Sequence, residues 1–326
     1  MKKILIIQTA FLGDVILSTP VISELKRLFS TSEIDVLVRK GNESLLANNP
    51  KIKSVFLFDK KKGKLKSIIS LIKTFRKKEY DLVINLHRFG SSGIIAGLSK
   101  GKERYGFSKN PFSFLYTKKF NHEIGNGKHE VERNLSLLKE FGGFTKLKPE
   151  LFPTEDDFAI ANQIASGTYF CFAPASVWFT KQLPVSKWVD LIDHYTHYGT
   201  VYLLGGKGDL EFCSSIIEKT ESKMGVNLSG QLNLLESAAL MKNATRNFVN
   251  DSGPLHIASA MNAPVTSFFC STTPDFGFGP LSDDSEIKQI NQKISCRPCG
   301  LHGHKTCPKG DFECGDNIDL GLSNEA

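Results

Sequence analysis

The residues best suited to chemistry lie in two stretches that each follow a short apolar run. In the second half of the chain, Asn247–Pro264 passes from an apolar run into NDSGP and then into a helical pattern. This pattern predicts a strand, a tight turn and a helix start, where Asp251 or Ser252 could cap the helix. The N–H groups and the positive dipole end of such a helix suit an anion such as a diphosphate, and His256 could add a donor. An ordinary capped helix would show the same pattern.

A carboxylate, Asp14, follows the first apolar run of the chain by a few residues, within FLGDV at 11–15. A general base must reach a hydroxyl proton, and a carboxylate at the carboxyl end of a strand could do so at the mouth of a cleft. The alternative is a helix cap or a first-turn acid.

Two further stretches suit a phosphate or a nucleotide. Phe172–Ser176 ends an expected strand, and Lys181 follows in TKQLP, where a lysine can neutralise phosphate as a mobile point charge. The turn LGGKGD at 204–209 has neither the G-x-G-x-x-G nor the G-K-[ST] spacing, which excludes the dinucleotide fingerprint and the P-loop. It could still let a nucleotide approach closely, with Asp209 or Glu211 near a ribose.

Four of the seven cysteines gather near the end of the chain with the spacing C-x2-C-x7-C-x6-C: Cys296, Cys299, Cys307 and Cys314. Compact Cys/His clusters suit structural zinc, although this spacing matches no standard finger. Packing thiols and a disulfide are the alternatives, and the absence of an export signal disfavours the disulfide. The other three, Cys171, Cys213 and Cys270, lie in or beside apolar segments and are expected in the core.

The elements that must position these residues are short apolar runs alternating with helical patterns. The expected strands are Lys3–Gln8, Ile34–Val38, Val55–Phe58, Leu82–Leu86, Arg104–Phe107, Tyr169–Ala173, Val201–Leu204, Phe248–Val249 and Val265–Phe269. The expected helices include Asp14–Phe29, Lys64–Lys78, Ile94–Leu98 and Val131–Phe141. This alternation predicts an α/β protein with parallel sheets and crossover helices. Gly142-Gly143, with Pro149 and Pro153 beyond, mark a boundary between domains 1–150 and 151–326, and a ligand cleft is expected between them at the carboxyl ends of the strands.

Composition and charge bound the class of protein. A chain of 326 residues with 40 % hydrophobic and 23 % charged residues has room for two globular domains and contains no apolar run of membrane-spanning length. Gln8, Thr9 and Asp14 interrupt the apolar start, so we expect a first buried strand there and not a signal peptide. Residues 1–150 hold 29 Lys and Arg against 14 Asp and Glu, whereas residues 151–326 hold 12 against 20. The basic first half therefore suits a polyanion such as nucleic acid, an anionic membrane or a phosphorylated glycolipid, unless its lysines only solvate helix faces.

Five stretches, in this order, carry a family resemblance. They are the opening KILIIQTAFLGDVILSTPVISELK, the strand YDLVINL at 80–86, the helix HEVERN at 129–134, the segment TKQLPVSKW and the block NDSGPLHIASAMNAPVTSFFCSTTP. Together with the Cys tail they resemble glycosyltransferase family nine, the bacterial ADP-heptose:lipopolysaccharide heptosyltransferases. The resemblance spans nearly the whole chain, and it departs from the family pattern at Asn85, where an acid is usual.

The resemblance implies a GT-B fold, with a Rossmann-like acceptor-binding domain (1–150) and a Rossmann-like nucleotide-sugar-binding domain (151–326) that ends in the Cys-rich tail (296–314). It implies an inverting transfer of heptose from ADP-heptose to the inner core of lipopolysaccharide without a catalytic metal or cofactor. By position, Asp14 would be the general base. The implied donor-binding residues are Ser176, Lys181, Asp209, Asp251, Ser252, Gly253 and His256, with Glu211 as the alternative ribose-binding acid.

The implied partners are an ADP-sugar and an anionic glycolipid of the lipid A-Kdo type. We further expect a cytoplasmic enzyme in transient contact with the inner membrane, and no nucleic-acid partner. Two alternatives stay open: a family member with another nucleotide-sugar or glycan acceptor, and a non-catalytic protein that binds nucleotide-sugar or nucleic acid. The chain shows no aromatic–basic binding motif, which disfavours nucleic-acid binding.

Overall fold

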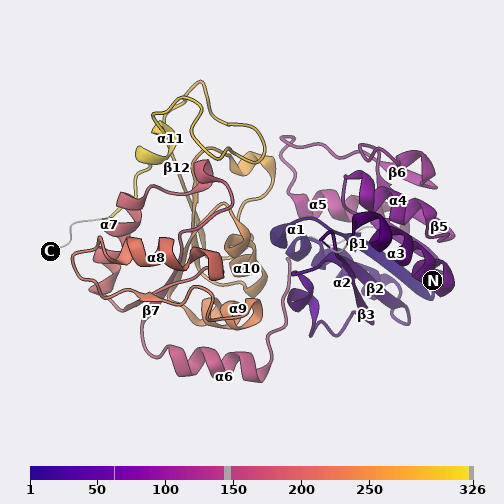
Figure 1. Cartoon of the computed structure of the whole chain (residues 1–326), viewed down its shortest axis with the longest axis horizontal. Helices are drawn as coiled ribbons and strands as arrows, with labels where there is room; N and C mark the ends of the chain where they lie inside the picture. Colours follow the sequence, from indigo (N-terminus) through magenta and orange to yellow (C-terminus); the bar gives the residue numbers. More distant parts are fainter. Residues whose placement is uncertain (62, 143–147, 323–326) are drawn as a thin grey trace. The chain divides into compact units, whose positions relative to one another are not determined.

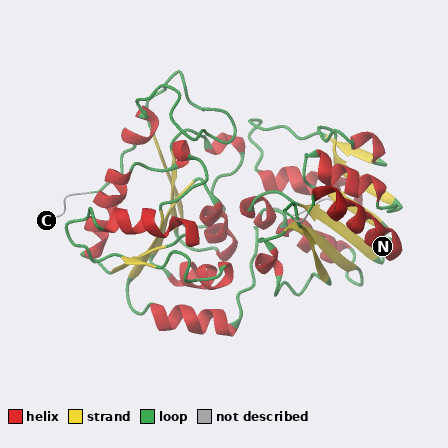
Figure 2. Ribbon diagram, in the orientation of Figure 1, coloured by secondary structure: helices red, strands yellow, loops and turns green. Residues whose placement is uncertain are grey.

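The computed structural model describes residues 1–61, 63–142 and 148–322, and the chain forms two compact units, Met1–Phe152 and Pro153–Ala326. Each unit has a six-stranded parallel sheet with helices on both faces (Figures 1 and 2). The prediction of doubly wound parallel sheets is confirmed. Of the expected Gly142-Gly143 helix end, Gly143 lies outside the described residues.

The sheet of the first unit has the strand order β3-β2-β1-β4-β5-β6. Its strands are β1 (Lys3–Gln8), β2 (Glu33–Arg39), β3 (Ser54–Phe58), β4 (Leu82–Asn85), β5 (Glu103–Phe107) and β6 (Lys118–Phe120). Its helices are α1 (Leu12–Ile16), α2 (Thr19–Leu28), α3 (Lys64–Lys78), α4 (Gly90–Leu98) and α5 (Glu130–Leu135), with 3-10 turns η1 (Glu43–Leu46), η2 (Ser113–Leu115) and η3 (Ser136–Phe141). The central strand β1 is buried from Ile4 to Gln8, as expected for a parallel strand covered on both faces.

The sheet of the second unit has the order β12-β11-β10-β7-β8-β9. Its strands are β7 (Tyr169–Ala173), β8 (Thr200–Leu203), β9 (Val226–Asn227), β10 (Arg246–Asn250), β11 (Val265–Phe269) and β12 (Ser285–Gln289). Its helices are α6 (Glu155–Ile164), α7 (Val185–Thr196), α8 (Leu210–Ile217), α9 (Leu234–Asn243), α10 (Gly253–Met261) and α11 (Glu313–Asp316), with 3-10 turns η4 (Phe179–Lys181), η5 (Lys207–Asp209) and η6 (Pro274–Phe276). Trp188 of α7 is fully buried against Phe172 of β7 and Phe268 of β11, which anchors that helix on the sheet.

Two helix predictions were wrong in extent. The expected helix Asp14–Phe29 is two helices, because Pro20 has no N–H to donate to the turn before it. The Thr19 hydroxyl instead donates to the Ile16 carbonyl at 2.8 Å and so satisfies an acceptor at the end of α1. The expected helix over 131–141 is α-helical only to Leu135 and then tightens into η3. The strands β6, β9 and β12 were missed because they are short or polar edge elements.

Both sheets have a switch point, where the strand order reverses about the first strand of the unit. In the first unit it lies between β1 and β4, and in the second between β7 and β10. The chain leaves the carboxyl ends of these neighbouring strands in opposite directions, which opens a crevice where ligands of such sheets bind. The loops at the two crevices begin at Thr9 and Leu86 in the first unit and at Pro174 and Asp251 in the second.

The three cysteines of the apolar segments lie in the core of the second unit. Cys171, Cys213 and Cys270 are buried as predicted, and all seven cysteines are free thiols. Across the described ranges, no helix combines the length and apolar character needed to cross a bilayer.

Candidate active site

The NDSGP turn lies at the crevice of the second unit, as a strand-to-helix connection between β10 and α10. Ser252 is the extended residue before the helix, and Pro254 occupies its first turn. The Ser252 hydroxyl is 3.4 Å from the Asn250 carbonyl, to which it donates instead of capping α10. Pro254 has no N–H, and the Leu255 N–H donates to the Ser252 carbonyl at 3.2 Å, so within this first turn the Gly253 N–H is the group that can be offered to an anion.

Lys181 and Asp251 form an ion pair in this crevice. Lys181 ends η4 in the loop after β7, and its Nζ lies 2.6 Å from Asp251 Oδ2. The Thr272 hydroxyl donates to the same oxygen at 2.6 Å. Both charged side chains are largely buried, with exposed fractions of 15 % for Lys181 and 7 % for Asp251. Asp251 is therefore placed to hold the ammonium group at the site instead of capping the helix.

Asn250 ties the two loops of this crevice together. Its amide nitrogen donates to the Pro174 carbonyl at 2.7 Å, and its amide oxygen accepts from the Leu183 N–H at 2.9 Å. The Gln182 side chain donates to the Ser176 carbonyl at 2.7 Å and folds the loop back on itself. Ser176 thus lies in the loop that carries Lys181.

His256 and the Gly-rich turn have different surroundings. His256 lies near the start of α10 and is buried, with its ring 6.4 Å from that of Phe278. Asp209 accepts from the Gly206 N–H at 2.8 Å and so holds its own turn, while Glu211 is exposed in the first turn of α8. Neither acid is joined to the Lys181–Asp251 pair, and the choice of ribose-binding acid stays a prediction.

The Cys-rich tail packs on the loop that carries Lys181. The His304 N–H donates to the Thr180 hydroxyl at 2.7 Å, and the Thr180 N–H donates to the His304 carbonyl at 3.1 Å. The Cys299 N–H donates to the Ser271 carbonyl at 2.8 Å. No local sequence pattern predicts that residues 296–314, referred to below as the tail strap, hold the residue immediately before Lys181.

The zinc prediction gains no support from this geometry. Among the residues that the structure describes, no three His, Cys, Asp or Glu side chains form a group that could hold a metal ion. Zinc binding by Cys296, Cys299, Cys307 and Cys314 stays a prediction, which metal analysis of the reduced, purified protein tests.

Asp14 lies in the first turn of α1, at the crevice of the first unit. It is half-buried, and burial followed by repulsion from Glu130 raises the pKa of its carboxyl to about 7, against the opposing pull of backbone N–H groups and Arg88. A carboxyl with that pKa can accept a proton near neutral pH and release it again. Asp14 is thus a first-turn acid that changes its protonation near neutral pH.

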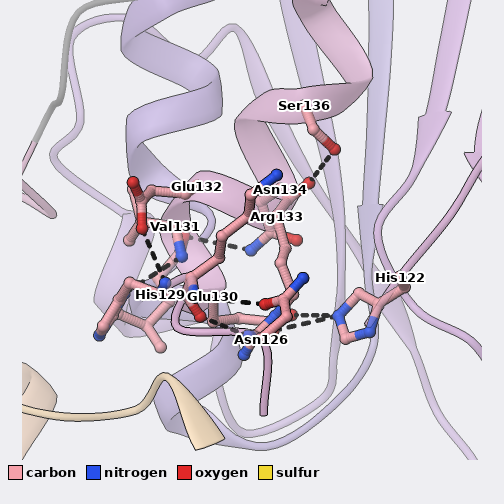
Figure 3. Close-up of polar contacts among 11 residues, drawn as sticks. His122, Asn126, His129, Glu130, Val131, Glu132, Arg133, Asn134 and Ser136 are labelled. Atoms are coloured by element: carbon pink, nitrogen blue, oxygen red, sulfur yellow. Dashed lines mark hydrogen bonds and ion pairs between the residues drawn. The ribbon is translucent and has the colours of Figure 1, made fainter. Parts of the chain in front are cut away.

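Glu130, which repels the Asp14 carboxylate, belongs to a buried charged cluster at the start of α5. The sequence analysis did not predict this cluster. Figure 3 shows the side chains of His122 and Arg133 pointing at the Glu130 carboxylate. His122 Nε2 lies 3.1 Å from both carboxylate oxygens, and Arg133 Nε donates to Oε2 at 2.7 Å. Burial by itself would raise the pKa of Glu130, but these two partners more than offset it and lower that pKa. Glu130 is therefore a fixed negative charge.

The HEVERN stretch also builds the start of α5. The His129 N–H donates to Glu132 at 2.8 Å, and the His129 ring accepts from the Val131 N–H, which completes a capping box (Figure 3). The Asn134 amide donates to the Leu17 carbonyl at 3.4 Å and joins α5 to the chain just beyond α1. The helix that holds Glu130 is thus anchored to the segment that holds Asp14.

The sequence analysis also did not predict His87 as a residue of this site. It follows β4, and its Nδ1 lies 2.8 Å from the Thr9 hydroxyl that follows β1, so it joins the two loops of this crevice. Burial, reinforced by Lys60 and Arg88, lowers the pKa of His87 to about 4. Its imidazole is therefore neutral at pH 7. Asn85, where the family usually has an acid, is fully buried and donates to the Tyr116 hydroxyl at 2.7 Å, which is a structural role.

A basic groove runs along β6 and η3 of the same unit, with a volume of about 460 Å³. Its cationic lining residues are Lys118, Lys119, Lys128, Arg133 and Lys139. Because Arg133 also bonds Glu130, the wall of the groove is continuous with the charged cluster.

Comparison with known proteins agrees with this geometry. Residues 68–308 match the family described as glycosyltransferase family 9 (heptosyltransferase). That range contains Lys181 and Asp251, while Asp14 precedes it. Lipopolysaccharide heptosyltransferase 3 of Escherichia coli K12 is 29 % identical over 286 residues, which cover 80 % of each chain. Lipopolysaccharide heptosyltransferase 1 of Campylobacter coli is 23 % identical over 316 residues, which cover 90 % of this chain and 91 % of that protein.

Solved structures share the fold. The glycosyl transferase family 9 protein of Veillonella parvula has a TM-score of 0.80 at 23 % identity, covering 88 % of this chain and 85 % of that one. Escherichia coli ADP-heptose lps heptosyltransferase II has a TM-score of 0.79 at 21 % identity, covering 92 % and 96 %. These likenesses confirm the predicted GT-B fold class. Because the family match covers most of the chain, this protein belongs to glycosyltransferase family 9 and is a glycosyltransferase.

Proposed function

We propose that this glycosyltransferase moves heptose from ADP-heptose to the inner core of lipopolysaccharide by a single, inverting displacement. The relatives at 29 % and 23 % identity are named lipopolysaccharide heptosyltransferases, which supports this donor and acceptor class. In the proposal, the first unit (1–150 as predicted) binds the acceptor and the second (151–326) binds the nucleotide-sugar. The reaction makes one bond from the acceptor oxygen to the anomeric carbon and breaks the bond from that carbon to the diphosphate.

The second unit has the groups needed to hold a departing diphosphate. Lys181 supplies a positive charge beside the N-terminus of α10, and the N–H groups at Gly253 add the positive end of the helix dipole. Such fixed positive charge can stabilise the leaving ADP without a catalytic metal. The Ser252 hydroxyl and His256 can donate further hydrogen bonds to the diphosphate or the sugar. Asp251 can accept a hydrogen bond from a sugar hydroxyl while its Oδ2 holds Lys181. Ser176 and Asp209 complete the proposed donor site.

The first unit has the group needed to activate the acceptor. In the proposed step, the Asp14 carboxylate takes the proton of the acceptor hydroxyl as that oxygen attacks the anomeric carbon. A pKa raised to about 7 makes Asp14 a stronger base than an exposed aspartate, at the cost of being partly protonated below neutral pH.

The acceptor we propose is an anionic glycolipid of the lipid A-Kdo type. The groove lined by Lys119, Lys128 and Lys139 offers positive charge to its phosphate and carboxylate groups, while Lys118 of the same groove is paired with Glu140. Such an acceptor places the enzyme at the cytoplasmic face of the inner membrane, in transient contact with it.

The observation that carries the proposal is the Asp14 carboxyl at the switch point of the first sheet, with its raised pKa. Turnover with ADP-heptose and a lipid A-Kdo acceptor, measured by release of ADP, is the direct test. A thermal-shift panel of other nucleotide-sugars tests the alternative donor. Stabilisation by a different nucleotide-sugar, with no transfer from ADP-heptose, would overturn the proposed donor.

A further inference from the structure

The outer side of the helical layer formed by α3, α4 and the η2 segment exposes an unusual set of large apolar side chains. Their exposed fractions are 74 % for Leu65, 53 % for Ile69, 66 % for Phe89, 37 % for Leu98 and 70 % for Phe114. We refer to these five residues as the apolar outer face. Scattered exposed apolar side chains are normal on proteins, so their value as evidence depends on whether they share one surface.

The elements that carry these residues are packed side by side. Figure 1 shows α3 and α4 adjacent in the first unit, and Arg76 Nε of α3 donates to the Leu98 carbonyl at the end of α4 at 2.7 Å. On its other side α4 packs directly on the η2 segment: a Cβ placed on Gly90 would lie 3.1 Å from the Phe112 ring. The five residues therefore belong to one continuous layer.

These side chains are not needed for the core of the unit. The core-facing side of α3 is already supplied by Ile68, Leu71, Ile72 and Phe75, which are buried against the sheet. Leu65 and Ile69 lie about a quarter of a turn around the helix from the centre of that buried side, next to Ile72. The apolar surface of α3 therefore extends beyond the part that the sheet covers, onto a flank that is exposed to solvent.

The charge of this layer is of one sign. Residues 60–78 contain nine Lys and Arg and no Asp or Glu, and residues 82–102 and 104–122 also lack acidic residues. On α3, Lys66, Lys73 and Lys77 are exposed around Leu65 and Ile69. Apolar side chains within a field of lysines suit a surface that is apolar beneath a negatively charged boundary, and an anionic phospholipid bilayer has that structure.

We propose that the apolar outer face docks on an anionic phospholipid bilayer, with Leu65, Ile69 and Phe114 entering the headgroup region and the α3 lysines binding lipid phosphates. The inference rests on the proposed glycolipid acceptor only for its biological setting, because lipid binding requires no sugar. It assigns the membrane contact to one named face of the first unit.

The placement suits delivery of a lipid-linked acceptor. Both α3 and α4 begin at the carboxyl ends of strands, β3 and β4, which is the edge of the sheet that also carries Asp14 after β1. The Thr9–His87 contact joins the loop before Asp14 to the loop that enters Phe89. A bilayer on the apolar outer face would therefore lie next to the edge where the acceptor hydroxyl is deprotonated.

The test compares vesicle binding by three variants of the full chain. The probes are vesicles of phosphatidylethanolamine with phosphatidylglycerol, and vesicles of phosphatidylcholine alone, in a flotation assay. Leu65→Gln with Ile69→Gln, and separately Lys66→Glu with Lys73→Glu and Lys77→Glu, should each weaken binding to the anionic vesicles by about tenfold or more. The matched control, Met224→Gln with Val226→Gln, removes exposed apolar side chains from the second unit and should bind as the parent does.

Further readouts separate the possible outcomes. Both α3 variants should keep parental ADP binding and parental turnover on a deacylated, soluble acceptor, while losing turnover on acceptor embedded in vesicles. Parental binding of both α3 variants to anionic vesicles overturns the docking proposal. The proposal is also overturned if the parent protein does not bind vesicles and instead forms a dimer through Leu65 and Ile69. The same holds if it does not bind vesicles and instead binds RNA through the α3 lysines. A parent protein that binds anionic vesicles but transfers sugar to neither acceptor would instead count against the proposed function and leave the docking proposal standing.

Discussion

Lys181 Nζ and Asp251 Oδ2 lie 2.6 Å apart and join the loop after β7 to the turn after β10, across the switch point of the second sheet. The two residues are separated by 70 positions in the chain, and only the parallel pairing of β7 with β10 brings them together. The Thr272 hydroxyl donates a second hydrogen bond to the same oxygen. Asp251 therefore holds the ammonium group near the N-terminus of α10 without a bound nucleotide-sugar. The site is therefore preorganised for an anion.

Replacing Lys181 tests this arrangement. We expect Lys181→Ala to weaken binding of ADP by about ten- to a hundredfold, because one charge-assisted contact to phosphate is lost and the Asp251 carboxylate then repels the ligand. Titration calorimetry with ADP measures the change. Lys219→Ala, an exposed lysine of the same unit, is the control and should match the parent. An ADP affinity unchanged in Lys181→Ala would remove Lys181 from the donor site.

Asp14→Asn should separate folding from catalysis. The amide has nearly the shape of the carboxyl but cannot take a proton, so turnover should fall by about a hundred- to ten-thousandfold while ADP affinity stays parental. Glu33→Gln, which changes an exposed acid of the same unit, should keep full turnover. A rate for Asp14→Asn near that of the parent would exclude Asp14 as the general base.

The same substitution should change the pH dependence of stability. The pKa of Asp14 is raised from 3.8 to about 7 in the folded chain, so the folded state holds this proton more tightly than the unfolded state does. Its contribution to the free energy of unfolding is therefore lost as pH rises from about 4 to about 7. We expect Asp14→Asn to be more stable than the parent by on the order of 1 kcal/mol near pH 8, after allowing for its partial exposure, and equally stable near pH 4. Denaturant unfolding at the two pH values measures this difference.

Glu130 should set the acid limb of the rate profile. In the parent, kcat/KM should fall about tenfold per pH unit below pH 7, as Asp14 becomes protonated. Glu130→Gln removes the neighbouring negative charge, which lowers the pKa of Asp14 and moves that limb to lower pH. Glu33→Gln, which changes an exposed acid of the same unit, is the control and should leave the limb in place. An unmoved limb in a folded Glu130→Gln protein would show that the buried cluster does not act on Asp14.

The tail strap offers a matched pair of glycines. Gly303 and Gly310 both have positive φ, +74° and +85°, so alanine costs similar backbone strain at either. A Cβ at Gly303 would lie 2.8 Å from Thr180 Oγ1 and 3.1 Å from Lys181 Cγ, whereas none of the described atoms lies within 4 Å of one at Gly310. We expect Gly303→Ala to weaken ADP binding several-fold by displacing the Lys181 loop, and Gly310→Ala to leave it unchanged. Equal affinities in the two variants would show that the strap has no part in donor binding.

The local chemistry of the site was present in the sequence. NDSGP after an apolar run predicted the strand–turn–helix unit, because glycine and proline there have strong local preferences. The alternation of strands and helices predicted parallel sheets, and nine of the twelve strands in the described part of the chain were expected close to their observed positions. The missed strands β6, β9 and β12 are edge elements whose polar or very short sequences resemble loops.

Other features depended on contacts that no local pattern encodes. His122, Glu130 and Arg133 resembled an ordinary loop and helix start, and only the packing of α5 buries them as one charged cluster. Asp251 was expected to cap a helix or contact the donor, and the pairing of β7 with β10 gave it Lys181 as a partner. The sequence by itself determined which residues have the right chemistry and which of them start helices, since those preferences act over a few positions. The tertiary structure alone decided the proton affinity of Asp14 and the partner of Lys181, because burial and electrostatics depend on neighbours that are distant in the chain.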